Sequence, residues 1–164
     1  VLINGGSSRG EEDYNSQMLQ RRASHFRHGV RTVPGRPVGM SIIDNHPVIN
    51  VPGPVGAAFL CCDWLIRGLV AHFLGTYAPQ RHTISARLTE DVKKPKPFER
   101  LARVTLQQSE DGTYTCTPLD VNGVARNIFG ADAMASLPSG SALIEKGTPL
   151  CVSLLKPLES ITHS

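Results

Sequence analysis

The sequence predicts an α/β module followed by an all-β module. Three observations lead to this fold class: an apolar run opens the chain, a second apolar run leads into a long apolar helix, and short β-rich segments fill the chain after residue 78. We therefore place one module at residues 1–78 and the other at 79–164. The 164 residues are enough for two small domains.

Elements of the first module follow from local patterns. Val1–Asn4 is a short apolar run, typical of a strand covered on both faces. Asp44-Asn45 between two apolar runs indicates a hairpin turn. Pro54 suits the first position of a helix, and Gly75 stands where a C-terminal cap belongs. The full prediction is a strand at 1–4, a helix at 14–24, strands at 29–33, 38–43 and 48–51, and a helix at 54–74.

The second module begins after a linker at 76–82. Short strands with turn residues between them predict a small barrel or sandwich. The turn at 110–112 contains Asp-Gly, a hairpin signal. We predict strands at 84–89, 101–106, 114–119 and 148–155, and one helical turn at 131–137.

Composition excludes several classes of protein. Hydrophobic residues make up 40% of the chain, so it can bury a core. The net charge of +3 is not that of a strongly basic nucleic-acid binder, and we expect no nucleic acid partner. The four cysteines form no CxxC pair, which predicts buried free thiols in a reducing compartment.

The predicted helix at 54–74 approaches the length of a membrane span. It contains Asp63, Arg67 and His72, and charged groups are expensive inside a bilayer. Asp63 and Arg67 are four residues apart, so they can pair along one helix face. We predict a buried helix of a soluble domain and no membrane partner.

The loop from Gly5 to Asp13 is the first candidate site. Its glycines, Ser7, Ser8 and Arg9 suit a phosphate cradle, because backbone amides can approach a ligand closely. Glu11, Glu12 and Asp13 would repel a bare anion, but they could hold Mg²⁺ that bridges to phosphate oxygens. A flexible turn with acidic residues at a helix start explains the same residues, and composition leaves both interpretations open.

Two further loops are candidates for anion binding. Val51-Pro52-Gly53-Pro54 joins a strand to the long helix, whose first amides can face an anion. If the strands at 1–4 and 48–51 are parallel, their loops share the carboxyl edge of the sheet, where α/β folds bind ligands. Arg36, in the turn 33–37, is a cation suited to an oxyanion, although a solvated turn arginine explains that turn equally well.

The order of these three loops resembles that of a known family. Gly5 to Tyr14 is similar to the GGxSxGxxDY stretch of MoeA-type molybdenum cofactor synthesis proteins, which include the gephyrin E domain. Pro34–Pro37 resembles the PGKP turn of that family, and Val51–Pro54 resembles its PGNP loop, here one residue shorter and without the Asn. Leu137–Gly140 and Val152–Leu155 resemble its small C-terminal β-barrel domain.

This resemblance implies a fold and an activity. The fold would be part of a three-layer αβα molybdopterin-binding domain, MoaB/MogA-like, at 1–78, followed by the β-barrel domain at 79–164. The activity would be that of a molybdopterin molybdenumtransferase, which inserts molybdate into adenylylated molybdopterin with Mg²⁺ and releases AMP. The implied partners are a pterin substrate, a second copy in a homodimer of the full-length protein and a MogA-like adenylyltransferase, all cytoplasmic.

The resemblance also assigns roles to individual residues. Asp13 and Arg36 would be the catalytic residues, and Asp13 with Glu12 would hold Mg²⁺. The implied substrate-binding residues are Gly5, Gly6, Ser7, Ser8, Gly10, Pro52 and Gly53. The family often has a lysine where this chain has Val33.

The alternative is a non-catalytic pterin-binding or scaffold module of the same fold. The chain lacks an initiator Met and opens inside a predicted core strand, so we expect a piece of a longer protein that is inactive alone.

Overall fold

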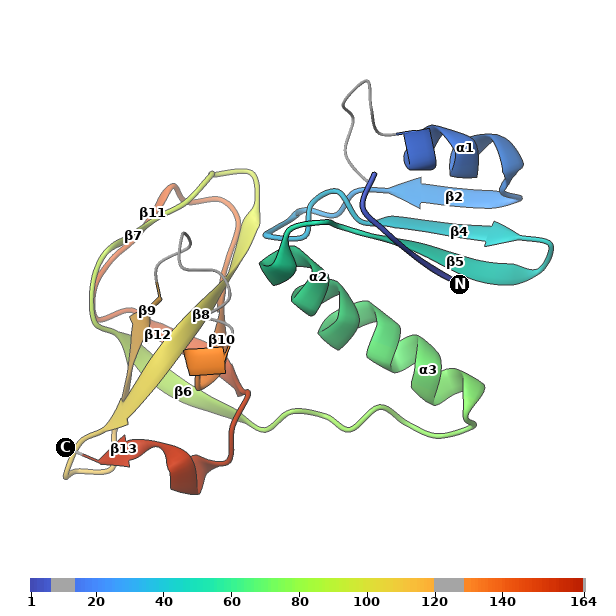
Figure 1. The fold of residues 1–164 in the computed structure, drawn as a ribbon. Coiled ribbons are helices and arrows are strands. Elements are labelled where there is room, and N and C mark those ends of the chain that lie inside the picture. The colour runs from blue at the N-terminus through green and yellow to red at the C-terminus, as the bar shows by residue number, and fades with distance from the viewer. Residues whose placement is uncertain (7–13, 120–128, 164) are drawn as a thin grey trace. The chain divides into compact units, whose positions relative to one another are not determined.

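The computed structural model describes residues 1–6, 14–119 and 129–163. The chain divides into two compact units, Val1–Ala78 and Pro79–Ser164 (Figure 1). Each unit has its own hydrophobic core.

The first unit is built on a four-stranded sheet with strand order β1-β5-β4-β2. Strands β1 and β5 are parallel, whereas β4 is antiparallel to both of its neighbours. The predicted hairpin is confirmed: Asp44 and Asn45, both with positive φ, link β4 to β5. The strands of the unit are β1 (Leu2–Asn4), β2 (His25–His28), β3 (Thr32–Val33), β4 (Gly39–Ile43) and β5 (His46–Val51).

Helices lie on both sides of this sheet (Figure 1). Helix α1 (Tyr14–Arg22) packs against β2 and β4 and buries Leu19. On the other side, one long helix runs through α2 (Val55–Cys61), the π-helical turn η1 (Cys62–Ile66) and α3 (Arg67–Phe73). Its apolar side chains pack on a core of buried residues, namely Val38, Ile49, Val51 and Cys61.

The long helix begins and ends as the sequence predicts. Pro54 stands at its N-cap, and Gly75 has a φ of +64° beyond its last turn. The Thr76 amide donates to the Ala71 carbonyl at 2.9 Å and the Gly75 amide to that of His72 at 3.1 Å, which together form a Schellman cap. The predicted pair is also confirmed, with Arg67 Nε 3.7 Å from Asp63 Oδ1.

The prediction that this helix is buried was wrong. Only 28% of the apolar window at Val55–Phe73 is buried, and by length and composition alone that helix could cross a membrane. One face packs on the sheet, while Trp64, Val70 and Phe73 are exposed. Single helices of this kind also occur as core helices of soluble proteins, so the span by itself is weak evidence for a membrane.

The second unit is a small barrel. Its sheet follows the order β10-β12-β6-β9-β8-β13, and an additional pairing of β10 with β8 closes it. A separate pair is formed by β7 and β11. The elements are β6 (Thr83–Leu88), β7 (Val92–Lys93), β8 (Glu99–Gln108), β9 (Tyr114–Pro118), β10 (Ala133–Leu137), β11 (Leu143–Ile144), β12 (Pro149–Leu154), the short 3₁₀ turn η2 (Leu158–Ser160) and β13 (Thr162–His163).

Alternating side chains fill the barrel. On β8, Ala102, Val104 and Leu106 face the core, and Leu137 and Val152 are fully buried beside them. Asp132 secures the start of β10: its carboxylate accepts the Leu106 amide at 2.9 Å and pairs with Lys156 at 2.7 Å.

Two predicted elements were wrong in type or place. The segment 131–137 is not a helical turn but contains strand β10, because its backbone pairs with β8 on one side and β12 on the other. Strand β2 at 25–28 was not predicted, and of the strand predicted at 29–33 only β3, Thr32–Val33, is formed, since Gly29 has a φ of +87° and ends β2.

Two predictions about burial were also wrong. Strand β1 is not covered on both faces, because it lies at the edge of the sheet and Leu2 is 56% exposed. All four cysteines are free thiols, as predicted, but only Cys61 and Cys116 are buried. Cys62 lies on the outer side of the helix and Cys151 on the outer face of β12, so both are exposed.

The αβα domain implied by the resemblance is not present in the described part of this chain. Residues 1–6 and 14–78 hold one small sheet with a single parallel strand pair and a helix on either side. The supported fold is an α/β unit followed by a small β-barrel.

Candidate functional site at the carboxyl edge of the sheet

The loops that follow β1 and β5 leave the sheet at the same edge. The parallel register places Asn4 beside Val51, so both strands end together. Strand β4 runs the other way and starts at Gly39, opposite Asn50. The turn before β4, which contains Arg36, therefore meets the sheet at this edge too. The parallel pairing, which was the condition for a shared edge, is present and brings the loops after β1 and β5 together. The antiparallel strand β4 brings the Arg36 turn to the same edge.

Gly5 and Gly6 form the start of the first loop. Their φ angles are +86° and +57°, a region that suits glycine. The Gly5 amide donates to the Val51 carbonyl at 3.0 Å, which extends the β1–β5 ladder by one bond. The Asn15 side-chain amide, from the first turn of α1, donates to the Gly5 carbonyl at 3.2 Å. The turn is therefore fixed by the strand on one side and by α1 on the other.

Pro52 and Gly53 form the second loop. Pro52 is fully buried, whereas Gly53 is exposed with open space where a side chain would stand. The Pro54 carbonyl accepts the amides of both Ala57 and Ala58 at 2.9 Å, so regular helix starts at once. The preceding amides of the first turn have no acceptor within a helix, and that end of the helix carries a positive partial charge.

Arg36 lies in the third loop and is exposed. Its backbone carbonyl accepts the Val30 amide at 3.0 Å, and the Val38 amide donates to Gly35 at 3.1 Å. These bonds hold the backbone of the turn in place. A guanidinium on such a turn can bind an oxyanion with more than one N–H group.

Several predicted site residues lie outside the described residues, namely Ser7, Ser8, Gly10, Glu12 and Asp13. Among the residues that are described, no group of three or more His, Cys, Asp or Glu is placed to hold a metal. The described acidic residues of the first unit lie elsewhere: Asp44 is at the hairpin turn, and Asp63 is in the helix beside Arg67. A Mg²⁺ site at this edge would depend on the hard carboxylate oxygens of Glu12 and Asp13, which are ligands of the right type.

Asn50 is a buried polar residue beside the Gly5–Gly6 turn that the sequence prediction did not single out. It is fully buried on β5, one residue before the strand ends. Its Nδ2 donates to the Gly6 carbonyl at 3.2 Å, while its Oδ1 is buried without a hydrogen-bond partner among the described residues. The only signal in the sequence is one amide in the apolar run 48–51.

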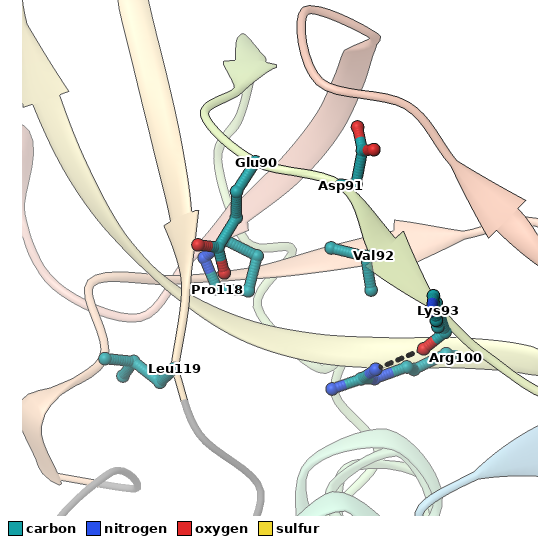
Figure 2. A pocket seen from close by; sticks show the side chains of 7 residues that line it. All are labelled: Glu90, Asp91, Val92, Lys93, Arg100, Pro118 and Leu119. Atoms are coloured by element: carbon teal, nitrogen blue, oxygen red, sulfur yellow. Dashed lines mark hydrogen bonds between the residues drawn. The ribbon is translucent and has the colours of Figure 1, made fainter.

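The second unit has a surface hollow of about 350 Å³ (Figure 2). Arg100 and Glu90 line opposite sides of this hollow. The Arg100 side chain donates to the Lys93 carbonyl at 2.9 Å. The Lys146 amide donates to Asp91 Oδ1 at 2.8 Å. Glu90, Asp91 and Lys93 are exposed to solvent, so this hollow does not enclose a ligand.

The two buried thiols, Cys61 and Cys116, are not activated. Burial raises the pKa of Cys61 to about 11, with a smaller contribution from neighbouring Cys62, and burial alone raises the pKa of Cys116 to about 11. Both thiols stay protonated at neutral pH, and a protonated thiol is a poor nucleophile.

Together, the fold and this edge define an α/β unit with three loops at one edge of its sheet, followed in the chain by a small β-barrel. Residues 85–155 match the model of the MoeA C-terminal region (domain IV). The molybdopterin molybdenumtransferase of Bacillus subtilis is 24% identical over 159 residues, which cover 95% of this chain and 37% of that protein.

Solved structures agree on the fold. The molybdopterin biosynthesis MoeA protein of Pyrococcus horikoshii superimposes with a TM-score of 0.72 at 23% identity, over 96% of this chain and 37% of that one. A molybdenum cofactor biosynthesis protein of Pyrococcus furiosus gives a TM-score of 0.62 at 21% identity, over 77% of this chain and 44% of that one.

The resemblance predicted from the sequence is confirmed: the chain is related to the C-terminal part of the MoeA family of molybdenum cofactor biosynthesis, and its second unit carries the MoeA C-terminal region. The chain spans little more than a third of the length of the curated relative.

Proposed function

We propose that this chain is the C-terminal part of a protein that inserts molybdate into adenylylated molybdopterin and releases AMP. The observation that carries the proposal is the parallel pairing of β1 with β5, which brings the Gly5–Gly6 turn and the Pro52–Gly53 loop to one edge. The name of the Bacillus subtilis relative, molybdopterin molybdenumtransferase, supports the same activity. Molybdate and the phosphate of the adenylylated pterin are both anions that such an edge would bind.

Each loop contributes a different interaction in this proposal. The backbone amides at the start of α2, together with Ser7 and Ser8, bind phosphate or molybdate oxygens. Pro52 and Gly53 set the path by which the anion reaches these amides. Arg36 places a positive charge where negative charge develops on the transferred oxyanion. Mg²⁺, held by Asp13 and Glu12, would supply charge neutralisation between the anionic groups.

The rest of the protein is needed for activity. The chain covers 37% of its curated relative, so elements from the other part would complete the substrate site. We expect no AMP release from residues 1–164 alone. The full-length protein would act in the cytoplasm as a homodimer and would take its substrate from a MogA-like adenylyltransferase.

The experiment measures AMP release by the full-length protein with molybdate, Mg²⁺ and adenylylated molybdopterin. We expect R36A to lower the rate about 100-fold, the usual scale for losing one group that stabilises an oxyanion. R27A is the matched control: Arg27 is an exposed arginine of β2 in the same unit, and we expect its removal to change the rate less than twofold. A wild-type rate for R36A would contradict the role of Arg36.

A second candidate function is a scaffold module that keeps the fold without turnover. The hollow lined by Glu90 and Arg100 favours it, because the molybdate reaction gives those residues no role. Replacement of Asp13 by Asn distinguishes the two functions. If the D13N change abolishes metal-dependent AMP release by the full-length protein, the enzyme is supported. If neither the wild-type protein nor the variant releases AMP, and both still bind their partner, the scaffold is supported.

A further inference from the structure

Strand β2 is the last strand of the first sheet, and among the described residues it has one partner strand, β4. Directly after β2, the Gly29 amide donates to the Val38 carbonyl at 2.8 Å. Bonded positions alternate along an antiparallel pair, so Arg27, two residues earlier, also turns its main-chain groups toward β4. Phe26 therefore turns its N–H and C=O away from the sheet.

A side-chain contact agrees with this orientation of Phe26. The Arg27 guanidinium, through Nη1, lies 3.4 Å from the Phe26 carbonyl and donates to it, so that carbonyl is open to groups outside the ladder. The main-chain groups on the outer side of such a strand are a template for pairing with another chain.

Positive charge lies along this side of the unit. Residues 14–43 contain five arginines and neither Asp nor Glu. Arg21 and Arg22 form the last turn of α1, which ends two residues before β2 starts, and Arg27 lies on β2 itself. All three are exposed, and none of them forms an ion pair with a carboxylate of the described residues. We call Arg21, Arg22 and Arg27 the basic strip.

Charge decides which segment can pair with β2. A second copy that paired through the same strand would set the basic side chains of both chains against each other, and like charges on facing strands are destabilising. Basic side chains on an outer strand are one way in which proteins prevent such self-association. A segment with carboxylates on the facing side gains main-chain hydrogen bonds and favourable cross-strand charge pairs together.

We infer that β2 accepts an extended, carboxylate-rich segment of another protein as a further strand of the sheet. The segment bonds to the outward main-chain groups of Phe26 and places its carboxylates beside the basic strip. This inference goes beyond the proposed function, because the molybdate reaction gives the residues of β2 and of the last turn of α1 no role.

The test is an NMR titration of the isotope-labelled chain with a short peptide of alternating glutamate and valine, whose carboxylates all lie on one side of a strand. We expect the peptide to shift the Phe26 amide signal and to slow the hydrogen exchange of that amide about tenfold or more, because a new hydrogen bond protects it. R27E should weaken peptide binding about tenfold, since a favourable cross-strand pair becomes a repulsive one.

K96E is the matched control. Lys96 is exposed in the second unit, so K96E changes the net charge by the same amount as R27E without touching β2. We expect it to change peptide affinity less than about twofold. An equal loss in both variants would mean that only the net charge matters, and it would overturn the inference.

Two further probes separate strand addition from simple attraction of charge. The same peptide with N-methylated backbone amides keeps its carboxylates but cannot donate main-chain hydrogen bonds, and we expect it to lose most of the affinity. If it binds as well as the parent peptide, no strand is added. Oligothymidylate is a polyanion of another class, and binding of it as tight as that of the peptide would indicate a nucleic-acid surface instead.

The wild-type chain supplies the remaining outcomes, which do not depend on how R27E folds. If the peptide does not bind, or binds without moving the Phe26 signal, β2 is not its site. If the Phe26 amide is already protected in the chain alone, and more so at higher protein concentration, a second copy covers β2. Each of these results overturns the inference and leaves the proposed molybdate reaction untouched.

Discussion

Replacing Gly6 by alanine tests how the anion-binding turn is built. Gly6 has a φ of +57°, which costs an L-residue about 1–2 kcal/mol. Its new Cβ would stand 2.6 Å from Asn15 Nδ2, so the Asn15 side chain must move and release the Gly5 carbonyl. Loss of the hydrogen bond from Asn15 to the Gly5 carbonyl adds about 1 kcal/mol to this cost. We therefore expect G6A to lower the free energy of unfolding of the first unit by about 2–3 kcal/mol.

The matched control is Gly5→Ala. Gly5 also has a positive φ, +86°, but a Cβ there would meet nothing within 4 Å. We expect G5A to lose only the backbone contribution, about 1–2 kcal/mol. Urea denaturation followed by the fluorescence of Trp64, the single tryptophan of the chain, reports on the first unit. The steric explanation would be refuted if G5A and G6A lowered the free energy of unfolding equally and if adding N15A to G6A did not reduce the loss.

Two further predictions concern the buried core. Burial raises the pKa of the Cys61 and Cys116 thiols to about 11, above the ordinary value of 9.0, so the unfolded chain loses these protons first as the pH rises. Their contribution to stability is complete below about pH 9 and falls between about pH 9 and 11, by roughly 1–3 kcal/mol for each thiol. Urea denaturation at about pH 8 and 10.5 measures this fall in the free energy of unfolding. A shallower pH dependence of that free energy in C116A gives the contribution of the Cys116 thiol. In the barrel, L137A removes a fully buried side chain and should cost about 2–5 kcal/mol. A loss below about 1 kcal/mol in thermal or urea unfolding would mean that the barrel core closes around the gap.

Features that depend on a few neighbouring residues could be predicted from the sequence. Asp44-Asn45 specifies its hairpin because both residues tolerate positive φ, and Gly75 specifies its helix cap for the same reason. Pro54 marks the start of the long helix. A shared edge for the loops after the strands at 1–4 and 48–51 could be stated from the sequence only on the condition that these strands are parallel, which they are. The position of the Arg36 turn at that edge depends on the antiparallel pairing of β4 with β5 and was not predicted.

Features decided by distant contacts could not be predicted in the same way. The segment that contains β10 is rich in alanine, which favours helix, but strand pairing on both sides overrides that preference. Strand β2 has the polar sequence His-Phe-Arg-His and gives no apolar signal, since it lies at the edge of the sheet. The position of Asn50 in an apolar strand has no explanation in the sequence alone. It is explained by two distant glycines, since Gly39 leaves space for the side chain and the Gly6 carbonyl accepts its amide.

The wide turn η1 changes how the long helix should be compared with those of related proteins. A π-helical turn holds more residues than an α-helical one, so it rotates everything after it about the axis. Leu69 lies against the sheet in this arrangement. Straightening this turn without removing a residue would rotate Leu69 by about 100° about the axis. Deleting one residue between 62 and 66 would instead restore regular winding and keep Leu69 against the sheet. A straight helix in a relative would therefore need its matching leucine one place earlier in the chain, and an alignment without a gap there would pair the wrong residues.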